Sequence, residues 1–385
     1  MGRRSALLRS AGGVACALAL SASLASSSGA SEARLHVEGS SCDWARATSL
    51  ASCGGMAALV KAAKAEGRLN AIALPPDWAN YGTLMSEFEK KYGIKIDDAN
   101  PEGSSQEEID AVIHEKGTGS EPDVVDVGPS FALEGQQQGL WAPYKVAEWK
   151  EIAPNEKASN GSWYFDYGGY ISIGYDASSV KPAPTSFKSL ENPAYKGEIA
   201  LNGNPTEAGA AFAAVYAAAL ANGGSFNDIQ PGIAFFKKLA KEGNFISAQS
   251  DATTIASGQV KIAIDWDYLN AGYSAPLKAK GIDWKVIVPS DAHYAAFYCQ
   301  AISRFAPDPA AARLWEEFLY SNEGQNGWLE GFARPVLLSS MVKAGTVDEH
   351  AYAALPPVSG TPQFPTQAQL TKAQAVLVKD WPSVG

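Results

Sequence analysis

Between Gly55 and Leu329 the sequence alternates short apolar runs with amphipathic segments, and this alternation restricts the fold more than any other feature. Residues 69–74 and 122–127 have the length and flanking turn residues of buried strands, whereas residues 81–92 place apolar side chains at helical spacing. This βαβα order predicts an α/β fold with a mostly parallel sheet covered by helices. Because 385 residues exceed one ordinary hydrophobic core, two lobes are expected.

The first thirty residues have the organisation of a secretory signal peptide. Three arginines and no acid precede a short run of apolar and small residues, and residues 26–30 are small. We predict a signal peptide over residues 1–30, with cleavage after Ala30, and therefore a protein secreted to the periplasm or cell surface. The apolar run is too short for a membrane-spanning helix. Arg3-Arg4 weakly resembles a twin-arginine signal, so Sec and Tat export both stay open.

The charge balance argues against nucleic acid as a partner. The chain has 31 Lys and Arg against 41 Asp and Glu, and loss of the three signal-peptide arginines leaves 28 basic residues. Proteins that bind nucleic acid carry clustered basic residues instead. An acidic balance does not by itself identify a ligand.

Two cysteines lie near the predicted mature N-terminus, in a segment that Gly and Ser flank. We predict a disulfide between Cys42 and Cys53, which would hold a poorly apolar N-terminal arm over residues 31–54 in an oxidising compartment. A second interpretation stays open, because Leu50 to Cys53 fits a lipoprotein box, although a long polar segment separates it from the apolar run. Cys299 has no obvious partner and is expected in the core.

Four segments carry a resemblance to a known family. They are residues 122–128 (PDVVDVG), 195–201 (YKGEIAL), 309–325 (PAAARLWEEFLYSNEGQ) and 333–336 (ARPV). In their order and spacing they resemble the extracellular solute-binding proteins of bacterial ABC importers, in the branch that serves polyamines, ferric iron and thiamine. The resemblance extends over roughly residues 54–338.

The resemblance implies a two-lobed, periplasmic-binding-protein-like Venus-flytrap fold of type II, with the ligand between the lobes. The first part of lobe 1 would span residues 55–167, lobe 2 residues 168–288, and the return to lobe 1 with the C-terminal tail residues 289–385. The chain would cross between lobes near residues 164–172 and 288–297. Such a protein captures a small polar solute, closes by a hinge motion and presents the solute to the transmembrane subunits of an ABC importer.

We expect the binding residues at strand ends, because ligands of open α/β sheets lie outside the carboxyl ends of strands. The strongest local signal is Asp265-Trp266-Asp267-Tyr268, in which acids and aromatic rings end a buried run and would suit a polar or cationic ligand. Free N–H groups at predicted helix starts add further candidates. For every position the competing interpretation is core packing or an ordinary helix start. The predicted ligand-binding residues are Asp77, Trp78, Tyr81, Gly128, Ser130, Trp163, Tyr164, Asn204, Thr206, Asp265, Trp266, Asp267, Tyr268 and Tyr298.

The identity of the solute stays open at the level of sequence. Iron-binding members of the family use a tandem tyrosine pair, but Tyr268 is followed by Leu269-Asn270. Polyamine-binding members place an acid in the strand that here spans residues 297–301, where no acid stands. Asp77, Asp126, Asp265 and Asp267 could still supply carboxylates to an amine. An amine such as a polyamine is therefore one candidate, and ferric iron, thiamine, a phosphonate and a sugar phosphate are the others.

No motif indicates an enzyme. The sequence lacks the G-x-S-x-G, P-loop and H-E-x-x-H patterns, and its four histidines lie far apart. We therefore predict a binding protein without catalytic residues, metal or cofactor, acting as a monomer. A ligand-sensing partner of a membrane receptor and a secreted hydrolase are the alternatives from other functional classes.

Overall fold

The computed structural model describes residues 42–358 and 364–384. The predicted signal peptide, residues 1–30, lies outside the described residues, as does the first part of the predicted arm. Residues from Cys42 onward form one compact unit, which is described here by itself. Within the described ranges, no helix combines the length and the apolar character that crossing a bilayer requires.

The first lobe is built around a parallel pair of strands and a neighbouring sheet. β1 pairs with β2 from Arg68 opposite Lys95 to Ile72 opposite Ala99. Glycines end α1, α2 and α4 in left-handed conformations, and a Ser104–Glu107 capping box begins α3. The elements of lobe 1 are α1 (Gly55–Glu66), β1 (Arg68–Ile72), α2 (Tyr81–Tyr92), β2 (Lys95–Ala99), α3 (Ser105–His114), β3 (Val124–Val127), α4 (Pro129–Gln138), β4 (Trp141–Ala142), α9 (Pro309–Leu319), α10 (Asn322–Glu330), β11 (Arg334–Pro335), α11 (Leu338–Ala344) and α12 (Glu349–Ala353).

The second lobe repeats this helix-and-strand style in the middle of the chain. Its alanine-rich α5 is buried on almost every face, because small side chains allow strands and helices to approach closely. The elements of lobe 2 are β6 (Ile199–Leu201), α5 (Gly209–Ala221), α6 (Gln230–Glu242), β7 (Phe245–Gln249), α7 (Ala252–Ala256), β8 (Ile262–Trp266), α8 (Asp267–Ala279) and β9 (Trp284–Ile287).

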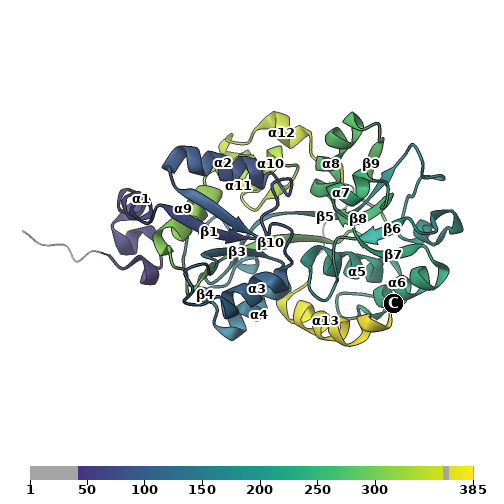
Figure 1. The fold of residues 1–385 in the computed structure, drawn as a ribbon, viewed down its shortest axis with the longest axis horizontal. Helices are drawn as coiled ribbons and strands as arrows, with labels where there is room; N and C mark the ends of the chain where they lie inside the picture. The colour runs from purple at the N-terminus through teal and green to yellow at the C-terminus, as the bar shows by residue number, and fades with distance from the viewer. Residues whose placement is uncertain (1–41, 359–363, 385) are drawn as a thin grey trace, which may run out of the picture. The chain divides into compact units, whose positions relative to one another are not determined.

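Two long strands connect the lobes (Figure 1). β5 (Tyr164–Asp176) pairs with β10 (Ala295–Ser303) up to Tyr170, and from Ile171 onward it pairs with β8 and β9. The main path of the nine-stranded sheet runs β3-β10-β5-β8-β6-β7. The change of partners after Tyr170 lies inside the crossing predicted from the sequence, and the second crossing lies between the end of β9 and the start of β10.

The expectation of a mostly parallel sheet is wrong. β1–β2, β6–β7 and β6–β8 are parallel, but β5 and β10 pair antiparallel with each other and with their neighbours β3, β8 and β9. The reason is that the two connecting strands run in opposite directions between the lobes. The sequence pattern marks strands but carries no information on their direction.

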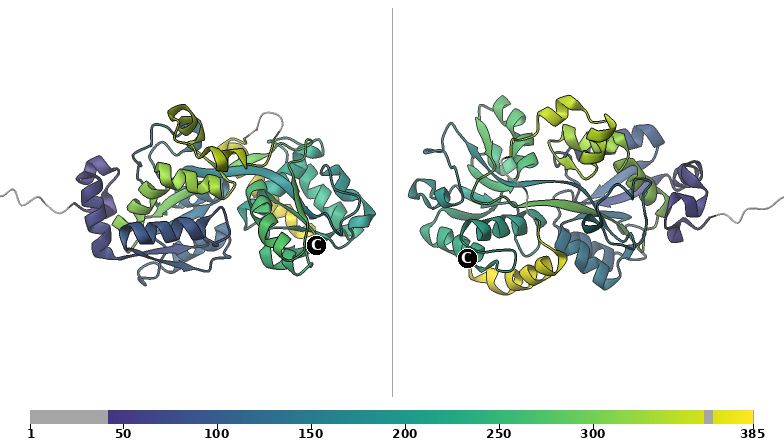
Figure 2. Two further views of the ribbon diagram at one scale, coloured as in Figure 1. Left: turned by 90° about the horizontal axis from the view of Figure 1, so that it is seen from above. Right: turned by 180° about the vertical axis from the view of Figure 1, so that it is seen from behind.

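The C-terminal helix contacts both lobes, as Figure 1 and the right view of Figure 2 show. α13 (Gln367–Asp380) packs against α4 of lobe 1 and α6 of lobe 2. Gln374 donates to the Thr206 carbonyl at 3.1 Å, and the Trp381 ring packs against Phe236 and Phe245 in lobe 2. The tail therefore joins the two lobes on a route separate from β5 and β10.

The N-terminal arm is attached to lobe 1. Cys42 and Cys53 form a disulfide with a Cα–Cα distance of 5.4 Å, and Cys53 is buried. The buried Arg313 guanidinium of α9 donates to the carbonyls of Ala45 and Ala47 at 3.2 and 3.0 Å. Cys299 is buried and unpaired, as expected for a small core residue.

The lobes touch directly beside the connecting strands. The backbone N–H of Gln106 in α3 donates to the Glu207 carbonyl of lobe 2 at 3.2 Å. Gly128 at the start of α4 meets Gly209 at the start of α5, and a Cβ at Gly209 would lie 3.1 Å from both the Gly128 Cα and the Tyr298 hydroxyl. Side chains at this point would hold the lobes apart, so the contact requires glycine on both sides.

We expect Gly209→Val to separate the lobes without unfolding either one, because the added methyl groups occupy the space of the Gly128 backbone. Small-angle X-ray scattering should show a larger radius of gyration than in the wild type. Gly272→Ala is the matched control, since a Cβ there meets nothing within 4 Å. A Gly209→Val protein with the wild-type radius of gyration would contradict this description of the contact.

Candidate functional site

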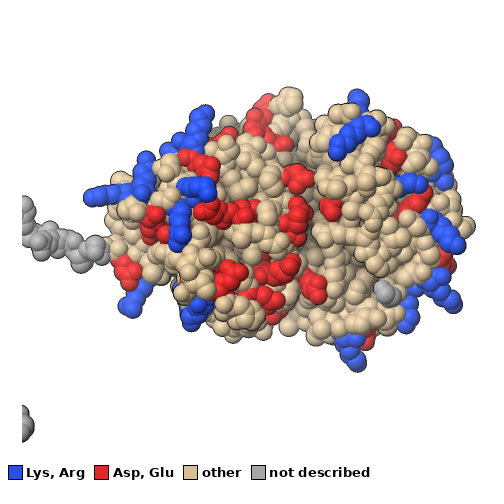
Figure 3. All heavy atoms as spheres, in the orientation of Figure 1, with Lys and Arg blue, Asp and Glu red and all other residues tan. Residues whose placement is uncertain are grey.

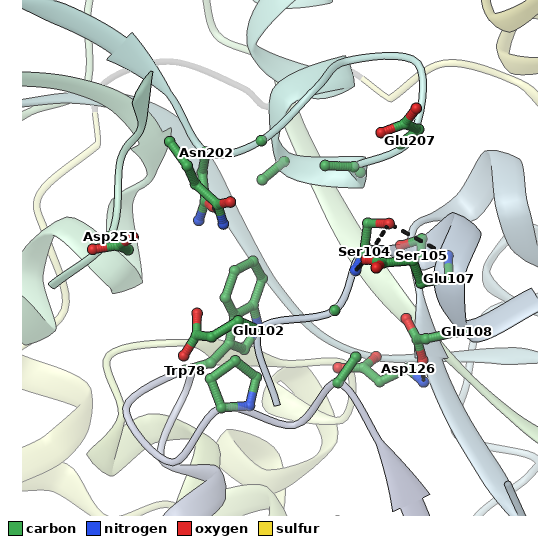
Figure 4. A pocket seen from close by; sticks show the side chains of 18 of the residues that line it. Trp78, Glu102, Ser104, Ser105, Glu107, Glu108, Asp126, Asn202, Glu207 and Asp251 are labelled. Carbon is green, nitrogen blue, oxygen red and sulfur yellow. Dashed lines mark hydrogen bonds between the residues drawn. The ribbon is translucent and has the colours of Figure 1, made fainter. Parts of the chain in front are cut away.

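A cavity of about 370 Å³ lies between the lobes, beside the glycine contact. Loops that follow strands form its walls (Figure 4), as expected for open α/β sheets. From lobe 1 it is lined by Ala73, Pro75, Asp77, Trp78, Glu102, Gly103, Ser104, Ser105, Glu107, Glu108 and Asp126. From lobe 2 and β10 it is lined by Asn202, Gly203, Asn204, Glu207, Ala208, Gly209, Ala210, Gln249, Asp251, Ala252, Thr253, Tyr273 and Tyr298.

The cavity is strongly acidic. Seven of its lining residues are carboxylic acids, and no lysine, arginine or histidine is among them. Figure 3 shows acidic side chains gathered along the middle of this face, whereas lysines and arginines lie toward its margins. Because carboxylates at close range repel one another, this surface favours a bound positive charge. The seven acids are Asp77, Glu102, Glu107, Glu108, Asp126, Glu207 and Asp251.

Acids from the two lobes face each other across the cavity. Burial raises the pKa of Glu102 above its ordinary value, and the negative charges of Asp77 and Asp251 raise it further. Glu102 belongs to the loop after β2, and Asp251 belongs to the loop after β7. An empty cavity therefore holds like charges in proximity, which a cation between the lobes would neutralise.

Asp126 at the end of β3 forms the floor of the cavity. One carboxylate oxygen, Oδ2, accepts hydrogen bonds from the hydroxyls of Tyr81 at 2.8 Å and Tyr167 at 2.6 Å. The other oxygen, Oδ1, is buried and has no hydrogen-bond partner. Because Asp126 lines the cavity, a donor group of a bound ligand could satisfy this oxygen.

Aromatic rings connect the wall of the cavity to this floor. The Trp78 indole N–H donates to the Tyr167 hydroxyl at 2.6 Å, and Tyr167 in turn donates to Asp126. The Trp78 ring meets the rings of Tyr268 and Tyr298 edge to face, with centroids 6.1 and 5.4 Å apart. Trp78 and Tyr298 also line the cavity, so their rings are available to a cation.

The structure brings four of the predicted binding residues to the cavity wall and places the others elsewhere. Asp77, Trp78, Asn204 and Tyr298 line it. Tyr81 lies directly behind the wall, where its hydroxyl contacts Asp126. The remaining predicted residues do not line this cavity: Gly128, Ser130, Trp163, Tyr164, Thr206, Asp265, Trp266, Asp267 and Tyr268.

The Asp265–Tyr268 segment is buried, contrary to the expectation that it faces the ligand. Asp265 is fully buried and accepts hydrogen bonds from the Asn202 side chain at 3.0 Å and from the Trp266 N–H at 2.8 Å. Asp267 pairs with Arg334 at 2.6 Å and accepts the Tyr170 N–H. The acids at this strand end have partners inside the protein, and one partner of Asp265, Asn202, lines the cavity.

The other predicted binding residues that do not line the cavity make contacts elsewhere within the protein. Trp163 is buried and donates to the Gln136 side chain at 2.6 Å, and it lines a separate cavity beside α13. Tyr164 packs edge to face on Tyr320. Gly128 forms the interlobe contact, Ser130 is buried in the first turn of α4, and the Thr206 hydroxyl donates to Asn204 at 3.0 Å.

Sequence reasoning missed much of the acidic lining. Glu107 and Glu108 lie in the first turn of α3, where acids also favour the helix dipole, so the sequence pattern alone does not mark them as cavity residues. Glu102 follows β2, so the rule of strand ends could have identified it. Asp251 follows β7, a strand that the sequence pattern did not reveal. The residues missed are Glu102, Glu107, Glu108, Asn202, Glu207, Gln249, Asp251 and Tyr273.

Comparison with known proteins identifies the family of this chain. The family model of bacterial extracellular solute-binding proteins matches residues 120–357, more than half of the chain. The chain belongs to the bacterial extracellular solute-binding proteins. This membership supports the role of substrate-binding component of an ABC importer, outside the cytoplasm, and it describes a binding protein rather than an enzyme. Among curated proteins, no sequence matches the chain significantly.

Solved structures confirm the two-lobed fold. The fructose-6-phosphate-bound periplasmic binding protein AfuA from Actinobacillus pleuropneumoniae is similar with a TM-score of 0.62 at 17% identity, over 82% of this chain and 99% of AfuA. Iron-bound HitA from Pseudomonas aeruginosa gives 0.61 at 19% identity, over 83% and 99% of the chains. A putative spermidine/putrescine ABC transporter from Listeria monocytogenes gives 0.58 at 16% identity, over 81% and 98%. At these identities the similarity establishes the fold alone.

Asp265 should make stability depend on pH. Burial raises its pKa from the ordinary value to about 7, against the opposing effects of the Trp266 N–H and Asn202. Because the folded-state pKa exceeds the unfolded value, this stabilisation is complete below about pH 4 and is lost as pH rises through about 7, a change of roughly 2–4 kcal/mol. Urea unfolding at pH 5 and pH 8 should show a smaller loss of stability in Asp265→Asn than in the wild type. Equal losses would contradict this assignment.

Proposed function

We propose that this protein captures a small organic cation, such as an aliphatic amine, between its lobes and delivers it to the transmembrane subunits of an ABC importer. The observation that carries the proposal is the cavity lining, in which seven carboxylic acids occur without one basic side chain. A cation placed there gains from every carboxylate and relieves the repulsion between them.

The same lining disfavours the other solutes. A phosphate or phosphonate group would be repelled by the acids and would find no lysine or arginine to pair with. Among the described residues, no group of three or more histidine, cysteine or acidic side chains converges closely enough to hold a metal ion. Carboxylates that are spread over a cavity suit a solute with separated positive charges better than a single ion.

The aromatic residues add a second element of recognition. Trp78, Tyr273 and Tyr298 line the cavity among the acids. Their ring faces attract ammonium groups and their apolar surface accommodates methylene groups. A solute with ammonium groups on an aliphatic chain matches both kinds of surface.

Binding and closure follow from the placement of the acids on both lobes. Glu102 and Asp251 stand on opposite sides of the cavity; burial raises the pKa of Glu102, and the charges of Asp77 and Asp251 raise it further. A cation between them converts this repulsion into attraction, which favours the closed arrangement. The charge of the solute would thereby drive the conformational change that the importer recognises.

We expect putrescine or spermidine to raise the melting temperature and to bind measurably by isothermal titration calorimetry, with an affinity that falls as salt increases. Fructose 6-phosphate and ferric citrate should give no shift. Stabilisation by fructose 6-phosphate in preference to the amines would refute the proposal.

Replacing acids on the two walls should weaken amine binding. The double variant Glu102→Gln/Asp251→Asn should lower the affinity roughly 5- to 30-fold, because each partly exposed charge pair is worth about 1 kcal/mol. Glu148→Gln/Glu349→Gln is the control, since it also removes two negative charges, from exposed sites outside the cavity. Equal loss in the control would show that only net charge matters.

A further inference from the structure

Two carboxylic acids, Glu108 and Asp126, lie at the floor of the cavity. Glu108 in the first turn of α3 accepts the Asp126 backbone N–H through Oε2 at 2.9 Å. Both residues line the cavity, and only 2% and 4% of their respective surfaces are exposed. Figure 4 shows the two side chains side by side below the loops of lobe 2.

The hydrogen bonds of Asp126 are unevenly distributed. Oδ2 is fully engaged by the two tyrosine hydroxyls, whereas Oδ1 is buried, lacks a partner and belongs to a residue that lines the cavity. An ionised carboxylate with such a free buried oxygen is costly. Either a proton on this pair or a positive group from the cavity would remove that cost.

Among the described residues, the titratable groups packed against Glu108 and Asp126 supply no positive charge that could remove the cost of the unpartnered oxygen. Gln300 occupies the position behind Tyr81 and links it to Asp166, with donor distances of 2.8 Å to each. The titratable groups that face the pair from the packed elements are Asp98 on β2, Glu107 on α3, Tyr81 on α2, Asp166 and Tyr167 on β5, Tyr268 on α8, Tyr298 and Cys299 on β10 and Glu316 on α9.

Burial and the neighbouring acids outweigh the hydrogen bonds that favour the charged forms of the pair. Burial raises the pKa of Glu108, and the charge of Asp126 raises it further. Burial also raises the pKa of Asp126, against the hydrogen bonds from Tyr167 and Tyr81. The uncharged form of at least one carboxyl group is therefore favoured in the empty cavity.

We propose that Glu108 and Asp126 hold a proton in the empty protein and release it to the solvent when a cationic solute binds over them. This inference rests on the proposed function, because it assigns the exchange to the ammonium group of the solute. The solute keeps its own protons. The proton leaves the carboxylic acid, and the carboxylate that remains pairs with the ammonium group.

The exchange links affinity to pH. At a pH where the pair is protonated in the empty protein, each cation bound releases one proton, so affinity rises roughly tenfold for each unit of increasing pH. Affinity stops rising with pH once the pH is high enough that the empty protein no longer holds the proton. A receptor of this kind binds an amine weakly in acid and tightly near neutrality.

Calorimetric titration with putrescine at one acidic pH, in buffers of different ionisation enthalpy, counts the protons released. We expect a value near one for the wild type and near zero for Asp126→Asn, which keeps acceptors for the tyrosines but cannot ionise, together with at least tenfold weaker binding. Glu108→Gln should also reduce proton release. Glu207→Gln, on the opposite wall, should lower affinity while leaving the proton count at the wild-type value.

The outcomes separate the two proposals. Putrescine binding with an enthalpy that does not depend on the buffer would overturn proton exchange while leaving amine capture intact. Absence of binding by every amine would overturn the proposed function. In that case infrared spectroscopy of the empty protein still tests the pair, because the band of a buried protonated carboxyl must be present in the wild type and reduced in Asp126→Asn and Glu108→Gln, with folding checked by circular dichroism.

Discussion

The shared strand β5 is the constraint on which the rest of the structure depends. Its first half is hydrogen-bonded to β10 in lobe 1, and its second half is hydrogen-bonded to β8 and β9 in lobe 2. Because β5 is hydrogen-bonded to strands of both lobes, it fixes where those strands end relative to the point at which the lobes meet. The loops after β3 and β6 consequently converge at Gly128 and Gly209, and the cavity lies beside that convergence.

Two buried acids, Asp267 and Asp126, differ in how their charge is compensated. Asp267 is buried but paired with Arg334, so it contributes to packing around the connecting strand. Asp126 is buried with one oxygen unpartnered, and the acids around it on the cavity wall have no basic partner among the lining residues. Asp267 and Asp126 therefore differ in their compensating partners and not in their degree of burial.

Local sequence patterns predicted the elements well and the site only in part. The Tyr81–Tyr92 helix has the predicted ends, and the partner change in β5 lies within the predicted crossing. The segment Asp265–Tyr268 misled, because a run of acids and aromatic rings at a strand end has the same sequence pattern whether Arg334 and Asn202 satisfy the acids or a ligand does. Those partners are distant in sequence. The acids of the cavity wall come from loops of both lobes, so only the tertiary structure shows that they form one surface.

The C-terminal helix has a mechanical consequence for the motion of the lobes. α13 rests on α4, while Gln374 and Trp381 fix it to lobe 2. Any rotation that widens the cavity must slide α4 along this helix or detach one of its ends. α13 would therefore resist opening of the lobes, although none of its residues lines the cavity.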